Sequence, residues 1–196
     1  MKPDEARPIL EHLEELRWRI VKSAVAILVG AVVAFFFSDL LREILELPFH
    51  RAQPESQFQV ITPAEQWGVL MRIAFFGGLV LASPVVLYQV WAFINPALTQ
   101  KERRWAVPLI AVMVVLFVGG LVFGYWVLPR GLEFLLEIFP DVRNDLRLSD
   151  YYSFVLRFLF AFGCSFLYPL FVFAAAAADL INSRQLPRGR RWAVLA

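Results

Sequence analysis

Four long apolar stretches divide the chain, and shorter polar segments separate them. A helix that crosses a bilayer needs about 20 apolar residues, because each residue adds about 1.5 Å across a hydrocarbon core about 30 Å thick. The stretches 19–41, 67–94, 105–128 and 151–178 meet this requirement. A fifth stretch begins near residue 191 and is too short to cross, so we expect the sequence to stop inside a further span.

The polar segment before the first span has a helical periodicity of its own. Its apolar residues recur every three or four positions and form one stripe: Ile9, Leu13, Leu16 and Ile20. The pattern predicts an amphipathic helix over about 5–19 that lies on the membrane surface and leads into the first span. The segments LREILELPF and LEFLLEIF have similar spacing and predict short amphipathic helices on the opposite face.

Three of the predicted spans contain a proline: Pro108 lies near the start of the third span, and two others lie well inside their spans. Pro84 lies inside the second span and Pro169 inside the fourth, and each removes a backbone hydrogen bond, which predicts a kink. Glycines in the same spans permit close helix contact, although both residue types are common in membrane helices. The predicted fold is therefore all-α: one integral membrane domain over 1–196, built as a polytopic bundle of kinked transmembrane helices.

The distribution of basic residues predicts the orientation of the bundle. Lys and Arg gather in the N-terminal segment, in the loop after the second span and in the segment before the fifth stretch. Such segments usually face the cytoplasm, so we expect a cytoplasmic N-terminus. Arg72 and Arg157 lie just inside spans near the opposite side, and they weaken this bias without reversing it.

Composition supports the membrane interpretation and excludes other classes. Apolar residues make up 59% of the 196 residues, more than the core of a soluble domain of this length needs. A net charge of +2 gives no support to nucleic-acid binding. Cys164 is the only cysteine, so we expect no internal disulfide, no metal site and no cofactor.

No catalytic motif is present in the sequence. His12 and His50 are the only histidines, they fall on opposite sides of the predicted membrane, and they do not form a HExxH site. The sequence also lacks the Gly-x-Ser-x-Gly pattern of serine hydrolases and the Walker A pattern of ATPases. We therefore expect a protein that is not an enzyme.

The charged residues at the predicted cytoplasmic face admit two interpretations. Glu15 and Arg19 have the i,i+4 spacing of an ion pair on a surface helix, and Glu14 and Arg17 have the i,i+3 spacing; such pairs stabilise a helix only slightly. Alternatively, Glu15 and Glu102 project into one cytoplasmic cup. Two carboxylates there would suit guanidinium groups, which carboxylates bind in a bidentate fork.

Two segments resemble the signature regions of the TatC family, the membrane receptor subunit of the twin-arginine protein translocase: HLEELRWRI and SPVVLYQVWAFINPALTQKERRWAVPL. Shorter matches are ELPF, FGYWVLP, DYYSFV and AFGCSF. The resemblance covers nearly the whole chain. It implies a fold of six spans with both termini in the cytoplasm, which agrees with the orientation predicted from the basic residues.

The resemblance also implies a function. TatC proteins recognise the twin-arginine signal peptides of folded cargo proteins and belong to a complex that exports this cargo across the cytoplasmic (inner) membrane. The complex uses the proton-motive force, contains TatA and TatB type subunits, and includes more than one copy of TatC.

Residue roles follow from the matched positions. Glu15 and Glu102 match the acidic residues that engage the arginine pair of the signal peptide. Other matched positions near that site are Arg17, Phe93 and Leu98, while Pro48 and Tyr125, together with the span prolines Pro84 and Pro169, fall on structural or coupling positions.

The chain departs from the family pattern in the fourth span. The family commonly has an acidic or amide residue there, in a pattern like S-F-E-x-P, whereas this chain has Leu167 at that position. A coupling role for that polar group is therefore in doubt here, unless the neighbouring Tyr168 provides a polar substitute.

Two other functions are open from the residues alone. A small-molecule transporter usually carries charged residues near the bilayer midplane at broken helices, and the predicted spans have the breaks but almost no central charge. A structural scaffold for other membrane subunits would have the same composition as a receptor, so only ligand binding separates the two.

Overall fold

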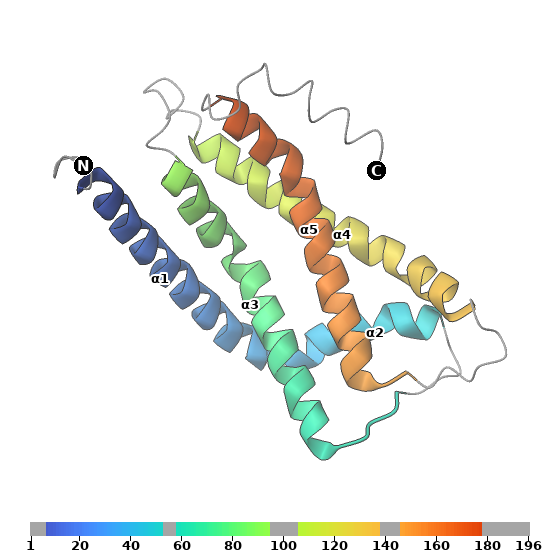
Figure 1. Cartoon of the computed structure of the whole chain (residues 1–196). Helices are drawn as coiled ribbons and strands as arrows, with labels where there is room; N and C mark the ends of the chain where they lie inside the picture. Colours follow the sequence, from blue (N-terminus) through green and yellow to red (C-terminus); the bar gives the residue numbers. More distant parts are fainter. Residues whose placement is uncertain (1–6, 53–57, 95–105, 138–145, 178–196) are drawn as a thin grey trace.

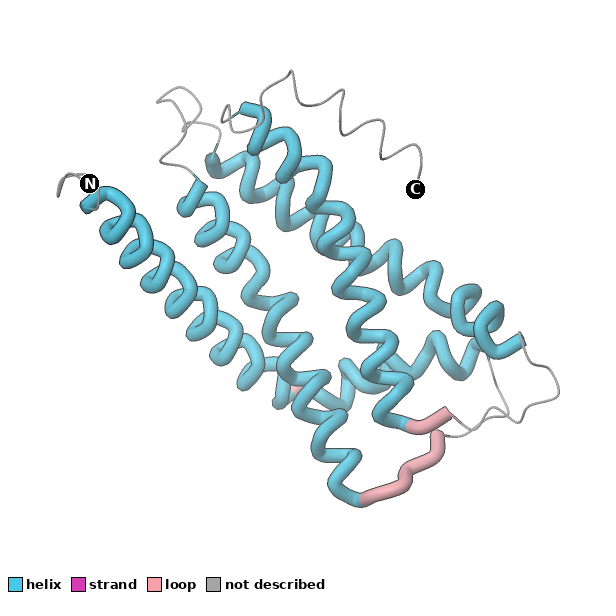
Figure 2. The backbone as a smooth tube through the Cα atoms, viewed as in Figure 1, coloured by secondary structure: helices cyan, strands magenta, loops and turns pink. Residues whose placement is uncertain are grey.

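The computed structural model describes residues 7–52, 58–94, 106–137 and 146–177. These residues form helices and short connecting segments, with one isolated parallel bridge between Gln59 and Arg147 (Figures 1 and 2). The helices are α1 (Arg7–Phe36), α2 (Ser38–Ala52), α3 (Pro63–Ile94), α4 (Ala106–Glu137) and α5 (Leu148–Ala177). The prediction of an all-α fold is confirmed.

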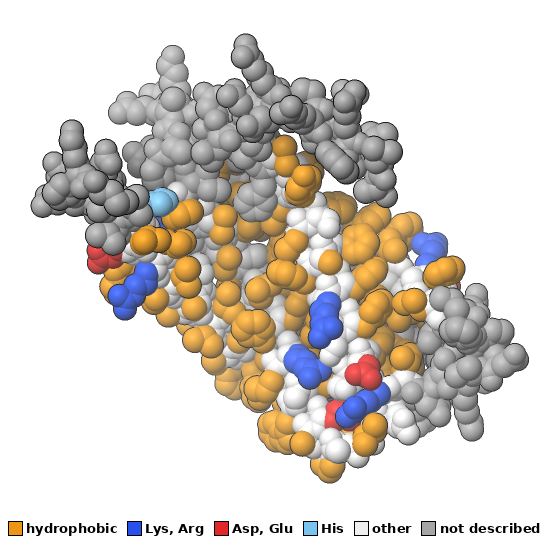
Figure 3. Space-filling view, in the orientation of Figure 1, with side chains coloured by type: hydrophobic (Ala, Val, Ile, Leu, Met, Phe, Trp, Pro, Cys, Tyr) orange, Lys and Arg blue, Asp and Glu red, His pale blue; other side chains and the backbone are white. Residues whose placement is uncertain are grey.

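Four of these helices are long and apolar enough to cross a membrane, namely α1, α3, α4 and α5. The apolar spans within them are His12–Phe36, Pro63–Phe93, Pro108–Leu135 and Leu148–Leu170. Much of their outward surface is apolar (Figure 3), as expected for helices that contact lipid. The chain is therefore a multi-pass membrane protein. The fifth stretch expected near residue 191 lies outside the described residues.

Helix α1 differs from the expected division into a surface helix and a span. It runs without a break from Arg7 to Phe36, because no proline follows its first turn and the first glycine is Gly30. The helix ends at Phe36, and the N–H of the next residue, Phe37, donates to the Ala34 carbonyl at 3.1 Å in a turn that leads into α2. The segment LREILELPF forms α2 as expected, whereas LEFLLEIF continues α4.

Two pairs of helices build the bundle. In Figure 1, α1 lies beside α3 and α4 beside α5, and α3 also contacts both members of the second pair. Helix α2 lies across the end of the bundle opposite the N-terminus (Figure 2). We call this the α2 end, and the end that contains the first turns of α1 the N-terminal end.

Glycines bring the backbones of paired helices into contact. A Cβ atom on Gly78 of α3 would lie 2.3 Å from the Ala31 nitrogen of α1, and one on Gly30 would lie 2.6 Å from the Gly78 carbonyl oxygen. Between α4 and α5, a Cβ on Gly120 would lie 2.6 Å from the Phe162 carbonyl oxygen. Larger side chains at these crossings would push the helices apart, because they would meet backbone atoms.

The buried side chains form two clusters. The larger one lies at the α2 end and comprises Leu45, Phe49, Val69, Ile73, Leu128, Leu132, Tyr151, Tyr152, Val155, Leu156 and Leu159. A smaller cluster joins α3, α4 and α5 nearer the N-terminal end and comprises Leu87, Trp91, Met113, Phe117 and Leu167. Both ends of the bundle are thus fixed by side-chain packing as well as by the crossings between them.

Candidate functional site

A cluster of polar and aromatic side chains at the N-terminal end contains the first predicted site residue, Glu15. Its Oε1 accepts hydrogen bonds from Arg19, one turn further along α1, through Nε at 3.2 Å and through Nη2. The second terminal nitrogen of Arg19 donates to Gln89 Oε1 of α3 at 3.4 Å. The guanidinium therefore links the carboxylate on α1 to the neighbouring helix.

An aromatic contact brings a second predicted site residue, Phe93, to the same place. The ring of Phe93 on α3 stacks on the ring of His12 on α1, with centroids 4.4 Å apart and planes 17° apart. His12 Nδ1 in turn lies 3.6 Å from Glu15 Oε2. The stack fixes the last turn of α3 against the first turns of α1, and it places an aromatic surface next to the carboxylate.

The carboxylate of Glu15 retains the capacity to bind a further cation. Its side chain is 37% exposed. Both bonds from Arg19 go to Oε1, so Oε2 has only the histidine nitrogen near it. An ionised carboxylate accepts about four hydrogen bonds through its two oxygens. A guanidinium arriving from outside the bundle can therefore bind this group without first displacing Arg19.

Of the other predicted binding residues, one is exposed and two lie outside the part of the chain that the structure describes. Arg17 is exposed on α1, and within the described part of the chain it forms no ion pair with Glu14, although the i,i+3 spacing suggested one. Glu102 and Leu98 lie outside the described residues. The cup that we expected between Glu15 and Glu102 therefore stays a prediction, since only Glu15 lies in the described part of the chain.

Sequence reasoning did not assign His12 and Gln89 to this site. His12 has a local signal, since it precedes Glu15 by three residues and so shares a helix face with it. Gln89 has none, because its contact with Arg19 depends on the packing of α1 against α3 across 70 residues of sequence.

The α2 end explains two positions that the family resemblance singled out, Pro48 and Tyr125. Pro48 lies inside α2 and has no N–H, so the carbonyl of Ile44, four residues earlier, lacks its helical partner. The hydroxyl of Tyr125 on α4 donates to that carbonyl at 2.8 Å. The tyrosine therefore satisfies the backbone acceptor that the proline leaves open, and the two residues act as one structural unit.

Two further tyrosines hold α2 against α5. The Tyr151 hydroxyl donates to the Leu45 carbonyl at 2.6 Å, and the Tyr152 hydroxyl donates to Glu46 Oε1 at 2.8 Å. Both tyrosines are almost completely buried. Helix α2 is thus anchored at consecutive residues by hydroxyl groups from two different spans.

A buried carboxylate joins the segments that lead into α3 and α5. Glu65 Oε1 accepts from Arg147 Nε and from the Ser149 backbone N–H, each at 3.0 Å, and Oε2 accepts from the Ile61 N–H at 3.2 Å. Beside it, the Gln59 N–H donates to the Leu146 carbonyl at 3.0 Å. These bonds hold together the starts of two membrane-spanning helices.

The mid-span positions provide no polar group at the family's usual place. Leu167 is 5% exposed and packs in the cluster of α3, α4 and α5, so an apolar contact replaces the expected polar residue. Tyr168 is 69% exposed and therefore does not substitute for a polar side chain at that buried position. Pro84 and Pro169 lie within α3 and α5, and both helices continue past them.

Comparison with known proteins identifies a single family. Residues 11–196 match the family model described as TatC: Sec-independent protein translocase protein (TatC). The Sec-independent protein translocase protein TatC of Aquifex aeolicus (strain VF5) is 38% identical over 192 residues, which cover 96% of this chain and 80% of that protein. The protein of the same description from Deinococcus radiodurans is 36% identical, with 96% and 72% covered.

A solved structure agrees with the sequence comparisons. A crystal structure of the twin arginine translocase receptor TatC in DDM has a TM-score of 0.84 to this chain at 37% sequence identity. The match covers 94% of this chain and 84% of the other. These similarities favour a component of a protein translocase over a small-molecule transporter or a general scaffold, and the relatives are named as translocase proteins rather than as enzymes.

Proposed function

The chain belongs to the TatC family of Sec-independent protein translocases, and from this premise we propose that it binds twin-arginine signal peptides through Glu15. The solved relative is described as the twin arginine translocase receptor. In this chain the corresponding ligand is a peptide with two consecutive arginines, and Glu15 accepts hydrogen bonds from one of their guanidinium groups.

One observation carries the proposal: the Glu15 carboxylate already binds a guanidinium, that of Arg19, through two nitrogens on a single oxygen. The environment therefore suits an ionised carboxylate and the planar fork of an arginine. A lysine ammonium presents a point charge rather than a fork and cannot make the same paired contact. The exposed Oε2 is the acceptor that we assign to the peptide.

The remaining expected residues complete the proposed site. Glu102 supplies a second carboxylate for the other arginine, and Leu98 and Phe93 contribute apolar contacts beside the pair. The stack of Phe93 on His12 supports this role for Phe93, because it holds an aromatic ring next to Glu15. Arg17 is exposed on the same helix and contributes to the orientation of the peptide.

The wider function follows from family membership. We propose that the chain lies in the cytoplasmic (inner) membrane with its N-terminus in the cytoplasm. There it acts with TatA and TatB type subunits and with further copies of itself. Export of folded cargo draws on the proton-motive force, and the chain contributes recognition rather than catalysis. Nucleic acid, metal ions and cofactors have no part in this function.

Binding of a synthetic signal peptide to the purified full-length protein in detergent tests the proposal. Peptides with Arg-Arg and with Lys-Lys would be compared on wild type, Glu15→Gln and Glu102→Gln. We expect wild type to prefer Arg-Arg by about tenfold, the size of one charge-assisted hydrogen bond, and each substitution to remove most of the preference.

Glu14→Gln is the matched control for this experiment. Glu14 is an exposed glutamate next to Glu15 that makes no ion pair within the described residues, so its substitution removes the same charge from the same helix. We expect Glu14→Gln to keep the Arg-Arg preference. If Glu15→Gln kept it as well, Glu15 would be only part of a solvated helix face, and the receptor proposal would lose its structural support.

A further inference from the structure

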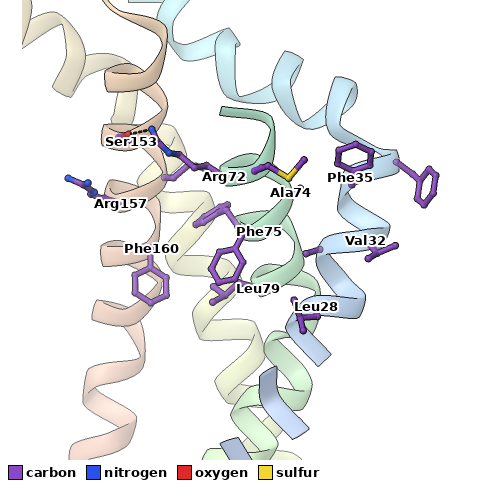
Figure 4. A pocket seen from close by; sticks show the side chains of 15 residues that line it. Leu28, Val32, Phe35, Arg72, Ala74, Phe75, Leu79, Ser153, Arg157 and Phe160 are labelled. Carbon is purple, nitrogen blue, oxygen red and sulfur yellow. Dashed lines mark hydrogen bonds between the residues drawn. The ribbon is translucent and has the colours of Figure 1, made fainter. Parts of the chain in front are cut away.

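An open groove lies between α1, α3 and α5 in the membrane-spanning part of the bundle. Its volume is about 900 Å³, and Figure 4 shows side chains from all three helices around it. Helix α3 packs against both α1 and α5 and forms the floor. Most of the lining is apolar and includes Leu28, Val32, Phe35, Met71, Phe75 and Phe160.

Two arginines, Arg72 and Arg157, are the charged residues among those that line the groove. Arg72 is nine residues into α3 and Arg157 nine residues into α5, so each lies about 13.5 Å along its helix from the first residue of that helix. Both positions fall inside the apolar spans Pro63–Phe93 and Leu148–Leu170. An ionisable residue at such a depth is costly unless another group compensates its charge.

The described part of the chain provides little compensation for these charges. One nitrogen of Arg72 donates to Ser153 Oγ at 2.7 Å (Figure 4). The same nitrogen donates to the Ser149 carbonyl at 3.3 Å, and both acceptors are neutral. Arg157 makes no hydrogen bond or ion pair with any described residue, and in Figure 4 it extends away from Arg72.

The acidic residues on the neighbouring turns do not meet these arginines. Glu65 is bound to Arg147, and Asp150 lies nearly two turns before Arg157, outside the lining of the groove. Since a guanidinium has five N–H donors, most of the donors of both arginines are available to an occupant of the groove.

We propose that this groove binds an anionic phospholipid, whose phosphate lies at Arg72 and Arg157 and whose acyl chain follows the apolar wall toward Leu28. A phosphate presents several acceptor oxygens to the guanidinium fork, and its negative charge offsets charges that the groove itself leaves uncompensated. The remaining surface, formed by aromatic and aliphatic side chains, suits a hydrocarbon chain.

The lining favours a lipid over a transmembrane helix of a partner subunit. Where helices of this bundle meet, small residues let their backbones approach, as Gly78 does at Ala31 and Gly120 does at Phe162. The groove has small residues at Ala31 and Ala74, but most of its lining consists of bulky side chains, among them Phe75 and Phe160. A flexible acyl chain can follow such an uneven surface, whereas close helix packing in membranes favours small residues.

Lipid binding to the purified, delipidated full-length protein in detergent tests the proposal. Native mass spectrometry would count retained molecules of phosphatidylglycerol and of phosphatidylcholine on wild type, Arg157→Gln and Arg72→Gln. We expect wild type to retain phosphatidylglycerol preferentially and each variant to bind it at least about tenfold more weakly. Arg157→Gln is the decisive variant, because Arg72 also holds Ser153 and its loss affects packing.

Arg130→Gln is the matched charge control. Arg130 lies over the ring of Trp126 on α4 at 4.8 Å and is not part of the groove. The Arg130→Gln variant should bind phosphatidylglycerol as wild type does. Inorganic phosphate, added without lipid, separates a lipid site from a simple anion site: we expect no competition at concentrations at which the lipid is retained.

A second pair of variants tests the position of the acyl chain. Val32 and Val29 are both 61% exposed on α1, but only Val32 lines the groove. We expect Val32→Trp to weaken phosphatidylglycerol binding and Val29→Trp to leave it unchanged.

Three results of the lipid-binding experiments would overturn the proposal. These are equal retention of the two lipids, wild-type retention by Arg157→Gln, and displacement of the lipid by inorganic phosphate alone. Cross-linking of a cysteine placed at position 32 to a partner subunit's helix would likewise assign the groove to protein instead of lipid.

Discussion

The two ends of the bundle hold their polar groups in opposite ways. At the α2 end, hydroxyls of Tyr125 and Tyr151 and the carboxylate of Glu65 bind backbone groups, and Tyr151 and Glu65 are buried. At the N-terminal end, Glu15 binds another side chain, Arg19, and remains partly exposed. The first arrangement fixes helices in place, whereas the second leaves a charged group available for exchange.

The difference has a simple energetic basis. Removing a partner from a buried backbone group costs the full desolvation of that group, about 1–3 kcal/mol. An exposed ion pair contributes little to stability, because water and salt replace either partner readily. A protein that must bind and release a ligand is therefore expected to place its recognition carboxylate in the second environment and to keep the first for structure.

Close contact between α1 and α3 supports the N-terminal end, because Gln89 and Phe93 of α3 meet Arg19 and His12 of α1 there. Gly78→Leu would break this contact, because even its Cβ would meet the Ala31 backbone nitrogen at 2.3 Å. We expect the largest loss of stability from this variant, at least about 4 kcal/mol, together with loss of peptide binding. An SDS titration of the purified protein, followed by circular dichroism, measures the change.

Gly68→Leu and Gly119→Leu are the controls for this prediction. Nothing lies within 4 Å of a Cβ atom built at either position. Both variants should unfold near the wild-type midpoint and bind the peptide normally. Wild-type stability of Gly78→Leu would mean that α1 and α3 do not meet at this glycine.

Glu65→Ala tests the α2 end directly. The substitution removes the acceptor of three donors: Arg147 Nε and the backbone N–H groups of Ser149 and Ile61. We expect the thermal midpoint in detergent to fall by several degrees, less than for Gly78→Leu but more than for Tyr125→Phe. Peptide binding at the opposite end should persist below that lowered midpoint, which separates the two ends experimentally.

Much of this fold could be predicted from hydropathy alone. Four spans follow from the length of the apolar stretches, and α2 follows from the spacing in LREILELPF. The sequence did not show which glycines lie at helix crossings. Gly78 and Gly68 are both in α3, but only Gly78 lies on the face that meets α1. The predicted surface helix was expected to lead into the first span, but its periodicity alone did not show that the two form one unbroken helix, Arg7–Phe36.

In the candidate site too, the local contacts could be predicted from the sequence and the contacts between helices could not. The pair of Glu15 and Arg19 is local and could be predicted from its spacing. The stack of His12 on Phe93 and the bond of Arg19 to Gln89 depend on the register of α1 against α3, which spacing does not reveal. Likewise, the hydrogen bond from Tyr125 to the Ile44 carbonyl joins residues 81 positions apart, so spacing does not reveal it.

A double-mutant cycle would sharpen the account of the α2 end. Tyr125→Phe leaves the Ile44 carbonyl without its donor and should cost about 1–2 kcal/mol. In a Pro48→Ala background the alanine N–H can donate to that carbonyl, so Tyr125→Phe should cost less there, with a coupling of about 1 kcal/mol. SDS titration of the four proteins measures this coupling; purely additive effects would contradict the pairing of the two residues.

The smallest effect on stability is expected from Glu15→Gln, the variant with the largest expected effect on recognition. Arg19 keeps its second partner, Gln89, and the exposed position allows water to replace the lost ionic contact. The thermal midpoint should stay close to that of wild type and of Glu14→Gln, while most of the Arg-Arg preference is lost. A fall in midpoint as large as that of Glu65→Ala would make Glu15 a structural residue, and the contrast between the two ends would no longer distinguish recognition from support.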